Sequence, residues 1–141
     1  MQELISGSLW IGNTAEARQP TKLHQQGIRA VVDLAYEVAP AALPRELIAH
    51  RIPLSDGDGN DASSLRLAIE SVERLIQAGI PALVACSAGL SRSPLIAAAA
   101  VARVENSSFE EILHRIQAVR PLDISPALLR DVAAAWQSQG M

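Results

Sequence analysis

Eight consecutive residues combine a thiol, a glycine and a guanidinium at a spacing that suits phosphate chemistry. They are Cys86, Ser87, Ala88, Gly89, Leu90, Ser91, Arg92 and Ser93. They follow an apolar run and precede a helical pattern, so their backbone N–H groups can curl around an anion at a helix N-terminus. Gly89 can adopt a positive φ in such a loop, and Arg92 offers a planar fork for two phosphate oxygens. We therefore expect the phosphate to be bound by Ser87, Ala88, Gly89, Leu90, Ser91 and Arg92.

Cys86 is the expected nucleophile of this loop. A helix N-terminus and a neighbouring guanidinium both favour the thiolate over the thiol. The hydroxyl of Ser93 can donate a hydrogen bond to the sulfur, which matters most when the thiolate has to leave phosphorus again. A lone cysteine after an apolar strand is more often a buried small hydrophobic residue. Gly89, Arg92 and Ser93 at fitting spacing favour the catalytic interpretation.

A leaving alkoxide or phenoxide needs a proton, and the polar loop at 55–61 offers carboxylic acids. We expect Asp56 to be the general acid, with Asp58 as the alternative. Gly57 and Gly59 would let this loop close over a substrate and open again. The competing interpretation of Asp56 is a turn-forming aspartate in a polar loop.

The order of the predicted elements brings the two segments to one edge of a sheet. Leu47 to Ala85 is predicted as strand, helix, strand, a unit that normally makes two parallel strands through a right-handed crossover. Asp56 follows the first strand and Cys86 follows the second. Parallel strands end at the same edge, where α/β proteins bind ligands. Taking the two strands as adjacent, we expect Asp56 and Cys86 at neighbouring positions.

The whole pattern predicts a single α/β domain over residues 1–141, with three layers and a central, mostly parallel sheet of about four to five strands. A chain of this length can bury a real core without disulfides or metals. Further strands are expected near Leu4 to Ser6, Leu9 to Ile11 and Ile28 to Leu34. Helices are expected over Thr14 to Gln26, around Leu65 to Ile76, over Pro94 to Val104, around Phe109 to Ile116 and from Ser125-Pro126 onward.

Composition excludes several classes of protein. The single cysteine rules out an intrachain disulfide framework and is typical of a reducing compartment, so we expect a cytoplasmic protein. The net charge of -3, with both signs interspersed, gives no footprint for nucleic acid or for an anionic membrane. The longest apolar stretch, Ile96 to Ala102, is too short to span a bilayer.

Residue usage rich in Ala and Arg, with Lys22 as the only lysine, is typical of a bacterial GC-rich genome. The sequence does not determine the oligomeric state, and we expect a monomer.

One run resembles a calcium site but fails on its details. Asp56, Asp58 and Asn60 match the start of an EF-hand loop, but the sixth residue is Asp61 instead of Gly and the twelfth is Leu67 instead of Glu. The three histidines lie in separate segments without ligand spacing. We expect no metal site.

Taken together, these segments resemble the dual specificity phosphatases, which are compact members of the cysteine-based protein tyrosine phosphatase superfamily. The resemblance rests on C-x5-R-S after an apolar strand, on Ile52-Pro53-Leu54-Ser55-Asp56 upstream and on Ile124-Ser125-Pro126 downstream. It starts at Leu9-Trp10-Ile11-Gly12 and covers nearly the whole chain. It implies the fold of that family and a phosphatase activity without a metal cofactor.

The resemblance also implies a role for each matching residue. Cys86 would form the phosphoenzyme, Arg92 and the loop amides would bind the phosphate, Asp56 would act as general acid and then base, and Ser93 would stabilise the thiolate. One position departs from the family, which usually has His directly before the nucleophile, where this chain has Ala85. That histidine helps to fix the loop and to favour the thiolate. Activity here is therefore expected to be lower or shifted to higher pH.

Several functions stay open at this point. The leading hypothesis is hydrolysis of phosphoprotein, with phosphotyrosine and also phosphoserine or phosphothreonine as substrates. A phosphate-binding module of negligible turnover is the alternative that Ala85 motivates. A phosphoinositide or RNA 5′ phosphate is a third, disfavoured because the loop has no lysine for a highly charged ligand. Tyr36 and Glu37 should rise at the same edge as Cys86, as a pocket rim or as an ordinary loop.

Overall fold

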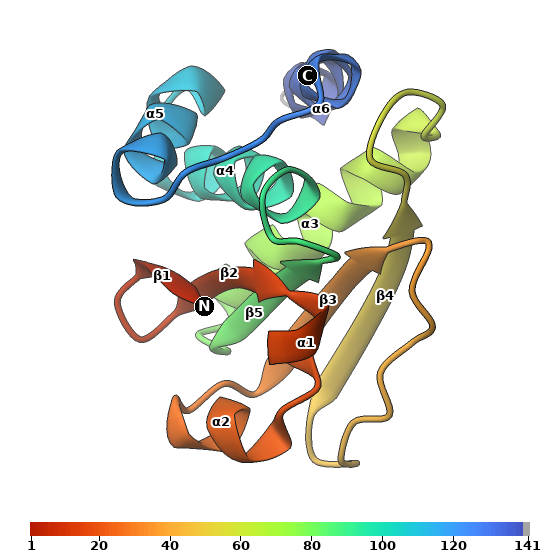
Figure 1. Cartoon of the computed structure of the whole chain (residues 1–141). Helices are drawn as coiled ribbons and strands as arrows, with labels where there is room; N and C mark the ends of the chain where they lie inside the picture. The colour runs from red at the N-terminus through yellow and green to blue at the C-terminus, as the bar shows by residue number, and fades with distance from the viewer. Residues whose placement is uncertain (140–141) are drawn as a thin grey trace.

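A five-stranded sheet lies between two helical layers in a computed structural model of the chain, which describes residues 1–139 (Figure 1). The strands are β1 (Gln2–Ile5), β2 (Leu9–Asn13), β3 (Ala30–Ala35), β4 (Ile48–Leu54) and β5 (Ala82–Cys86). Their order across the sheet is β1-β2-β5-β3-β4. Only β1 runs antiparallel to its neighbour. The predicted mostly parallel sheet of four to five strands, flanked by helices, is confirmed.

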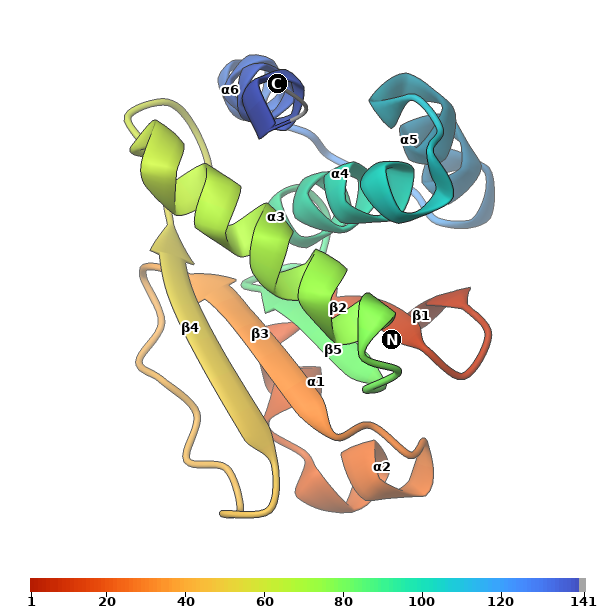
Figure 2. The ribbon, with the colours of Figure 1, turned by 180° about the vertical axis from the view of Figure 1, so that it is seen from behind.

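The helices cover the sheet unequally. They are α1 (Thr14–Ala17), α2 (Pro20–Gln25), α3 (Ala62–Gln77), α4 (Arg92–Glu105), α5 (Phe109–Val119) and α6 (Pro126–Gln139). Figure 2 shows α3 and α4 against one face with α5 and α6 beyond them, while α1 and α2 lie against the other face. Among the described residues, no helix is both long and apolar enough to cross a membrane.

Side chains along β5 alternate between the two layers, as the period of two in a strand requires. Val84 and Cys86 belong to the larger buried cluster beneath α3 and α4, and Leu83 and Ala85 belong to the smaller one beside α1 and α2. The strand is buried along its whole length. The side chains of Cys86 and Ala85 therefore face opposite sides of the sheet.

The helical segment predicted over Thr14 to Gln26 forms two short helices, α1 and α2. The break falls at Gln19, whose φ of -114° and ψ of 81° are not helical. Pro20 follows it directly, and proline disfavours a helical conformation in the residue before it. Gly27 ends the second helix with a φ of 77°, as its position in the sequence predicts.

Helix α4 begins at Arg92, two residues before the predicted Pro94. Proline has no N–H to donate, but in the first turn of a helix that N–H has no partner to lose. Arg92 and Ser93 thus lie in the first turn of α4. Their side chains are fixed by a regular element, so they sit on rigid backbone next to the loop.

Candidate active site

The loop 87–91 joins the end of β5 to the start of α4 at the carboxyl edge of the sheet, where the sequence predicts it. Cys86 is the last residue of β5 and is 1% exposed. Among the described residues, the backbone N–H groups of residues 87–91 donate none of the backbone hydrogen bonds found outside helices and strands. These amides are therefore available to an anion at the N-terminus of α4.

Gly89 is the position where the loop needs a glycine. Its φ is 73°, in the left-handed region that side chains disfavour. A Cβ there would lie 2.9 Å from the carbonyl carbon and oxygen of Gly12 and 2.9 Å from Nη2 of Arg120. The loop packs this closely onto β2 because Gly89 has no side chain.

Ser93 makes the contacts to the sulfur that the sequence predicts. The Ser93 backbone N–H donates to Sγ of Cys86 at 3.4 Å, and the Ser93 Oγ lies 3.4 Å from the same sulfur. Oγ is also 3.4 Å from the carbonyl oxygen of Gly12. A hydroxyl has one proton to donate. It can go to Gly12 while Cys86 is a thiol and turn to the sulfur when Cys86 is a thiolate.

Three further hydrogen bonds connect the loop and the end of β5 to neighbouring segments. The hydroxyl of Thr14 donates to the Cys86 carbonyl at 3.3 Å. The Asp123 N–H donates to the Leu90 carbonyl at 3.0 Å, and the Ser125 N–H donates to Oγ of Ser91 at 3.2 Å. Figure 1 shows this connection between α5 and α6 passing over the start of α4. The downstream Ile124-Ser125-Pro126 motif thus supports the loop as well as starting a helix.

The guanidinium of Arg92 is held by two groups and keeps one edge free. Nη1 donates to Oε1 of Glu37 at 2.7 Å and to the Leu54 carbonyl at 2.8 Å, and Nη2 donates to Oε2 of Glu37 at 2.7 Å. Arginine has five N–H donors. The buried Nε has no partner among the described residues, and neither does the second N–H of Nη2. These two donors form the fork that a phosphate can occupy.

Glu37, for which the sequence predicts either a pocket rim or an ordinary loop, contacts Arg92 in the structure. The Ser87 hydroxyl also donates to its carboxylate. The hydrogen bonds from Arg92, followed by the one from Ser87, outweigh burial and lower the pKa of Glu37 to about 2. The same pairing is the main cause that raises the pKa of Arg92, and the charges of Cys86 and Asp56 add to it. Glu37 therefore belongs to the site and not to an ordinary loop.

The expectation that Asp56 and Cys86 follow adjacent strands is wrong, because β3 lies between β4 and β5. The strand order puts the residues after β3, not those after β4, next to the loop. Glu37 consequently fills the position beside Arg92. The crossover from β4 to β5 skips one strand, and a sequence pattern alone does not distinguish the two connections.

Asp56 is exposed on the loop after β4, near enough to Arg92 for their charges to interact. Asn60 closes this loop: its Oδ1 accepts from the Ser55 N–H at 2.8 Å, and its Nδ2 donates to the carbonyls of Ser55 at 2.9 Å and Gly57 at 3.4 Å. The two bonded carbonyls flank Asp56 in the sequence. Asn60, which resembled a calcium ligand in the sequence, thus fixes the backbone on both sides of the expected acid.

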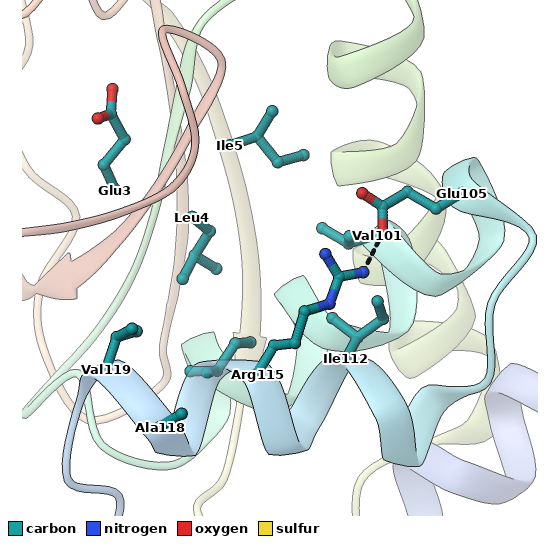
Figure 3. A pocket seen from close by; sticks show the side chains of 10 residues that line it. Glu3, Leu4, Ile5, Val101, Glu105, Ile112, Arg115, Ala118 and Val119 are labelled. Carbon is teal, nitrogen blue, oxygen red and sulfur yellow. Dashed lines mark hydrogen bonds and ion pairs between the residues drawn. The ribbon is translucent and has the colours of Figure 1, made fainter.

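A separate groove is lined by residues outside this loop (Figure 3). It has a volume of about 350 Å³ and runs between β1 and the helices α4 and α5. Leu4, Ile5 and Val119 are among its apolar lining residues, and Arg115 is paired with Glu105 at its edge. Through the register of β1, β2 and β5, its Ile5 end lies at the start of β5, opposite to the end that carries Cys86. It contains none of the predicted site residues.

Comparison with known proteins shows the family of this chain. Residues 9–134 match the family described as "Dual specificity phosphatase, catalytic domain". This chain belongs to the dual specificity phosphatase family. The predicted family membership is confirmed, and the domain is a protein phosphatase catalytic domain of the cysteine-based kind.

Individual dual specificity phosphatases are similar to this chain in sequence or in structure. Rat dual specificity protein phosphatase 12 is 30% identical over 120 residues, which cover 83% of this chain and 35% of that protein. The chain thus spans about a third of the length of this relative. The structure of human DUSP28 has a TM-score of 0.86 at 19% identity and covers 99% of this chain and 98% of its own.

A second similar structure is the human tyrosine phosphatase-like serine/threonine/tyrosine-interacting protein. Its TM-score is 0.85 at 17% identity, with 100% of this chain and 98% of that chain covered. At these identities, the two human structures show that the fold is shared. The roles of individual residues have to be argued from the geometry of this chain.

Proposed function

We propose that this dual specificity phosphatase domain hydrolyses phosphoprotein through a cysteinyl-phosphate on Cys86. The observation that carries the proposal is the Nε–Nη2 edge of Arg92, which has no partner among the described residues. It lies next to the loop 87–91, whose backbone N–H groups donate none of the backbone hydrogen bonds outside helices and strands and which directly follows Cys86. A phosphate monoester offers the oxygens that these donors lack. It also places phosphorus next to a sulfur that Ser93 is built to contact.

The reaction has two steps that balance in atoms and protons. In the first, the Cys86 thiolate attacks phosphorus, the P–O bond to the leaving group breaks, and the carboxylic acid of Asp56 gives that oxygen its proton. In the second, water attacks phosphorus and gives a proton to the Asp56 carboxylate. The P–S bond then breaks and phosphate leaves. The Ser93 hydroxyl stabilises the departing thiolate, and Arg92 with the loop amides binds the phosphoryl oxygens throughout.

Phosphoprotein is the proposed substrate class, because the loop brings one arginine and no lysine to the ligand. A phosphoinositide or an RNA 5′ end carries more negative charge than this set of groups balances. The cytoplasmic location, the bacterial source and the monomeric state remain predictions.

A phosphate-binding module with negligible turnover is the competing function. Ala85 favours it, since no imidazole supports the loop, and one protein of the same fold is described as phosphatase-like and interacting. In that case the free edge of Arg92 would serve recognition of a phosphorylated partner only. The two functions predict the same binding and different chemistry.

Hydrolysis of para-nitrophenyl phosphate separates them. The native chain should turn it over, and Cys86→Ser and Arg92→Ala should each abolish turnover. Cys86→Ser should still bind a phosphotyrosine peptide, because its arginine and amides are intact. Binding by the native chain without Cys86-dependent hydrolysis would establish the binding module instead. A panel of phosphopeptides, phosphoinositides and RNA 5′ ends, with Cys86→Ser as blank, then tests the substrate class.

A further inference from the structure

The carboxylate of Glu37, which orients Arg92, belongs to a segment without regular secondary structure. Residues 36–47 connect β3 to β4 and form neither helix nor strand. Glu37 lies at the start of this segment, and its side chain is half exposed. Solvent-exposed connections of this kind are mobile unless other groups fix their backbone. The alignment of Arg92 therefore depends on whatever holds the segment at Glu37.

Arg51 in β4 holds this segment by hydrogen bonds to backbone carbonyls on both sides of Glu37. Its Nη2 donates to the carbonyls of Val38 at 2.9 Å and Ala35 at 3.1 Å, with the Tyr36 carbonyl at 3.5 Å. Its Nη1 donates to Oδ2 of Asp33 at 2.8 Å. These carbonyls bracket Glu37 in the sequence, so one guanidinium fixes the turn that presents the carboxylate.

The position of Arg51 is itself fixed by the sheet. Asp33 is its register partner on β3, and the register between β3 and β4 shifts between Asp33 and Ala35. The other oxygen of Asp33 accepts from the Ala35 N–H at 3.1 Å. Arg51 and Asp33 are only 26% and 18% exposed. Three carbonyls converge here on one cation, and a planar guanidinium reaches them and a carboxylate at once, as an ammonium cannot.

We propose that Arg51 is a positioning residue for the phosphate site. It holds the turn 35–38 so that Glu37 meets Arg92, and it acts on a bound phosphate only through that pair. The Leu54 carbonyl links this turn to Arg92, since it accepts a hydrogen bond from Arg92 Nη1 at 2.8 Å and another from the Tyr36 N–H at 3.3 Å. The inference rests on the proposed function in taking Arg92 as the phosphate ligand.

Tungstate, an inert tetrahedral oxyanion, tests this inference without turnover. Its dissociation constant is measured by calorimetry for the native chain, Arg51→Gln, Glu37→Gln and the double variant. Arg51→Gln should weaken binding about tenfold, as expected for residues coupled in one network. In the Glu37→Gln background the same change should have little further effect. A merely structural Arg51 would lower thermal stability but leave tungstate affinity unchanged.

Arg103→Gln is the matched control. It breaks the ion pair between Arg103 and Glu73 of α3, which is buried to a similar degree as the pair of Arg51 and Asp33. Arg103 lies at the far end of α4 from the loop. Its tungstate affinity should stay within about twofold of the native value, since mutations at distant sites act independently. If Arg51→Gln does not fold, Arg51→Lys keeps the charge but not the fork, and it should show a smaller loss with the same dependence on Glu37.

The inference is overturned if Arg51→Gln binds tungstate like the native chain, or if it weakens binding equally with and without Glu37. Parallel assays with para-nitrophenyl phosphate separate this result from the proposed function. A native chain that binds tungstate but does not hydrolyse the ester refutes the phosphatase proposal, and the tungstate comparison still decides the role of Arg51. A native chain that binds no tungstate overturns both.

Discussion

Glu37 and Arg92 are 55 positions apart in the sequence and are joined by two hydrogen bonds of 2.7 Å, one from each Nη of the guanidinium. The pair uses the end of the guanidinium and leaves the Nε–Nη2 edge to a ligand. Arg92 is 3% exposed and Glu37 is 50% exposed, so the carboxylate reaches in from the surface to a buried cation. In the proposed function, Arg92 is thereby aligned before phosphate arrives, which would reduce the free-energy cost of binding.

Glu37→Gln should lower kcat/KM for para-nitrophenyl phosphate about tenfold, near the lower end expected for a hydrogen bond to a charged group because the carboxylate is half exposed. The amide oxygen can still accept one hydrogen bond from Arg92. Steady-state kinetics with a thermal melt as control measures the effect. Higher activity in the variant would mean that Glu37 blocks Arg92 instead of orienting it.

The pH dependence of that pair has a defined window. The pKa of Glu37 falls from 4.5 to about 2 on folding, so its contribution to stability is present above about pH 4.5 and is lost as the pH drops towards 2. Removing Glu37 should therefore lower the free energy of unfolding at pH 7 and leave it unchanged near pH 2. Urea denaturation of the native chain and Glu37→Gln at several pH values measures this. A stability difference that persists at pH 2 would contradict the assignment.

Asp56→Ala should lower turnover by about 10² to 10⁴, the usual contribution of a positioned acid. The loss should shrink for substrates with good leaving groups, which need less protonation. Asp58→Ala is the matched control, because Asp58 is an exposed aspartate on the same loop. Turnover of phenyl phosphate and para-nitrophenyl phosphate would be compared for both variants. Near-normal activity in Asp56→Ala, with the loss in Asp58→Ala, would reassign the acid.

Ala85→His should move the alkylation of Cys86 by iodoacetamide to lower pH, because an imidazolium behind the loop favours the thiolate. Ala85 is 1% exposed and faces the smaller cluster beside α1 and α2, so a larger side chain costs about 1 to 3 kcal/mol of stability. Ala85→Leu adds similar bulk without charge and is the control. An alkylation midpoint that is unchanged, or shifted equally in both variants, would refute an electrostatic role.

Both phosphotyrosine and phosphothreonine peptides should be hydrolysed, with tyrosine favoured because phenoxide leaves more easily than alkoxide. The chain has only four aromatic residues, and Phe109 is buried in α5 against Trp136. Tyr36, 67% exposed beside Glu37, is the aromatic residue expected at the mouth of the site. A shallow mouth lets short phosphorylated side chains reach the sulfur. Values of kcat/KM on matched peptides measure this. Hydrolysis of the tyrosine peptide alone would indicate a deeper pocket.

The sequence by itself determined the loop between β5 and α4. Cys86, Gly89 and Arg92 lie within seven consecutive positions, so their spacing alone places them on one turn between a strand and a helix. The positive φ of Gly89 and the contacts of Ser93 to the sulfur then follow from local geometry. The break between α1 and α2 falls directly before Pro20, a residue that commonly marks a helix boundary.

Only the tertiary structure decided which carboxylate meets Arg92. Strand order depends on packing between distant segments, and the insertion of β3 between β4 and β5 places Glu37 beside Arg92 and leaves Asp56 one strand further away. Arg51 gave no signal at all, because its partners besides Asp33 are backbone carbonyls, which every residue has. Contacts made by the backbone across strands leave no residue pattern, and these are the contacts that align this site.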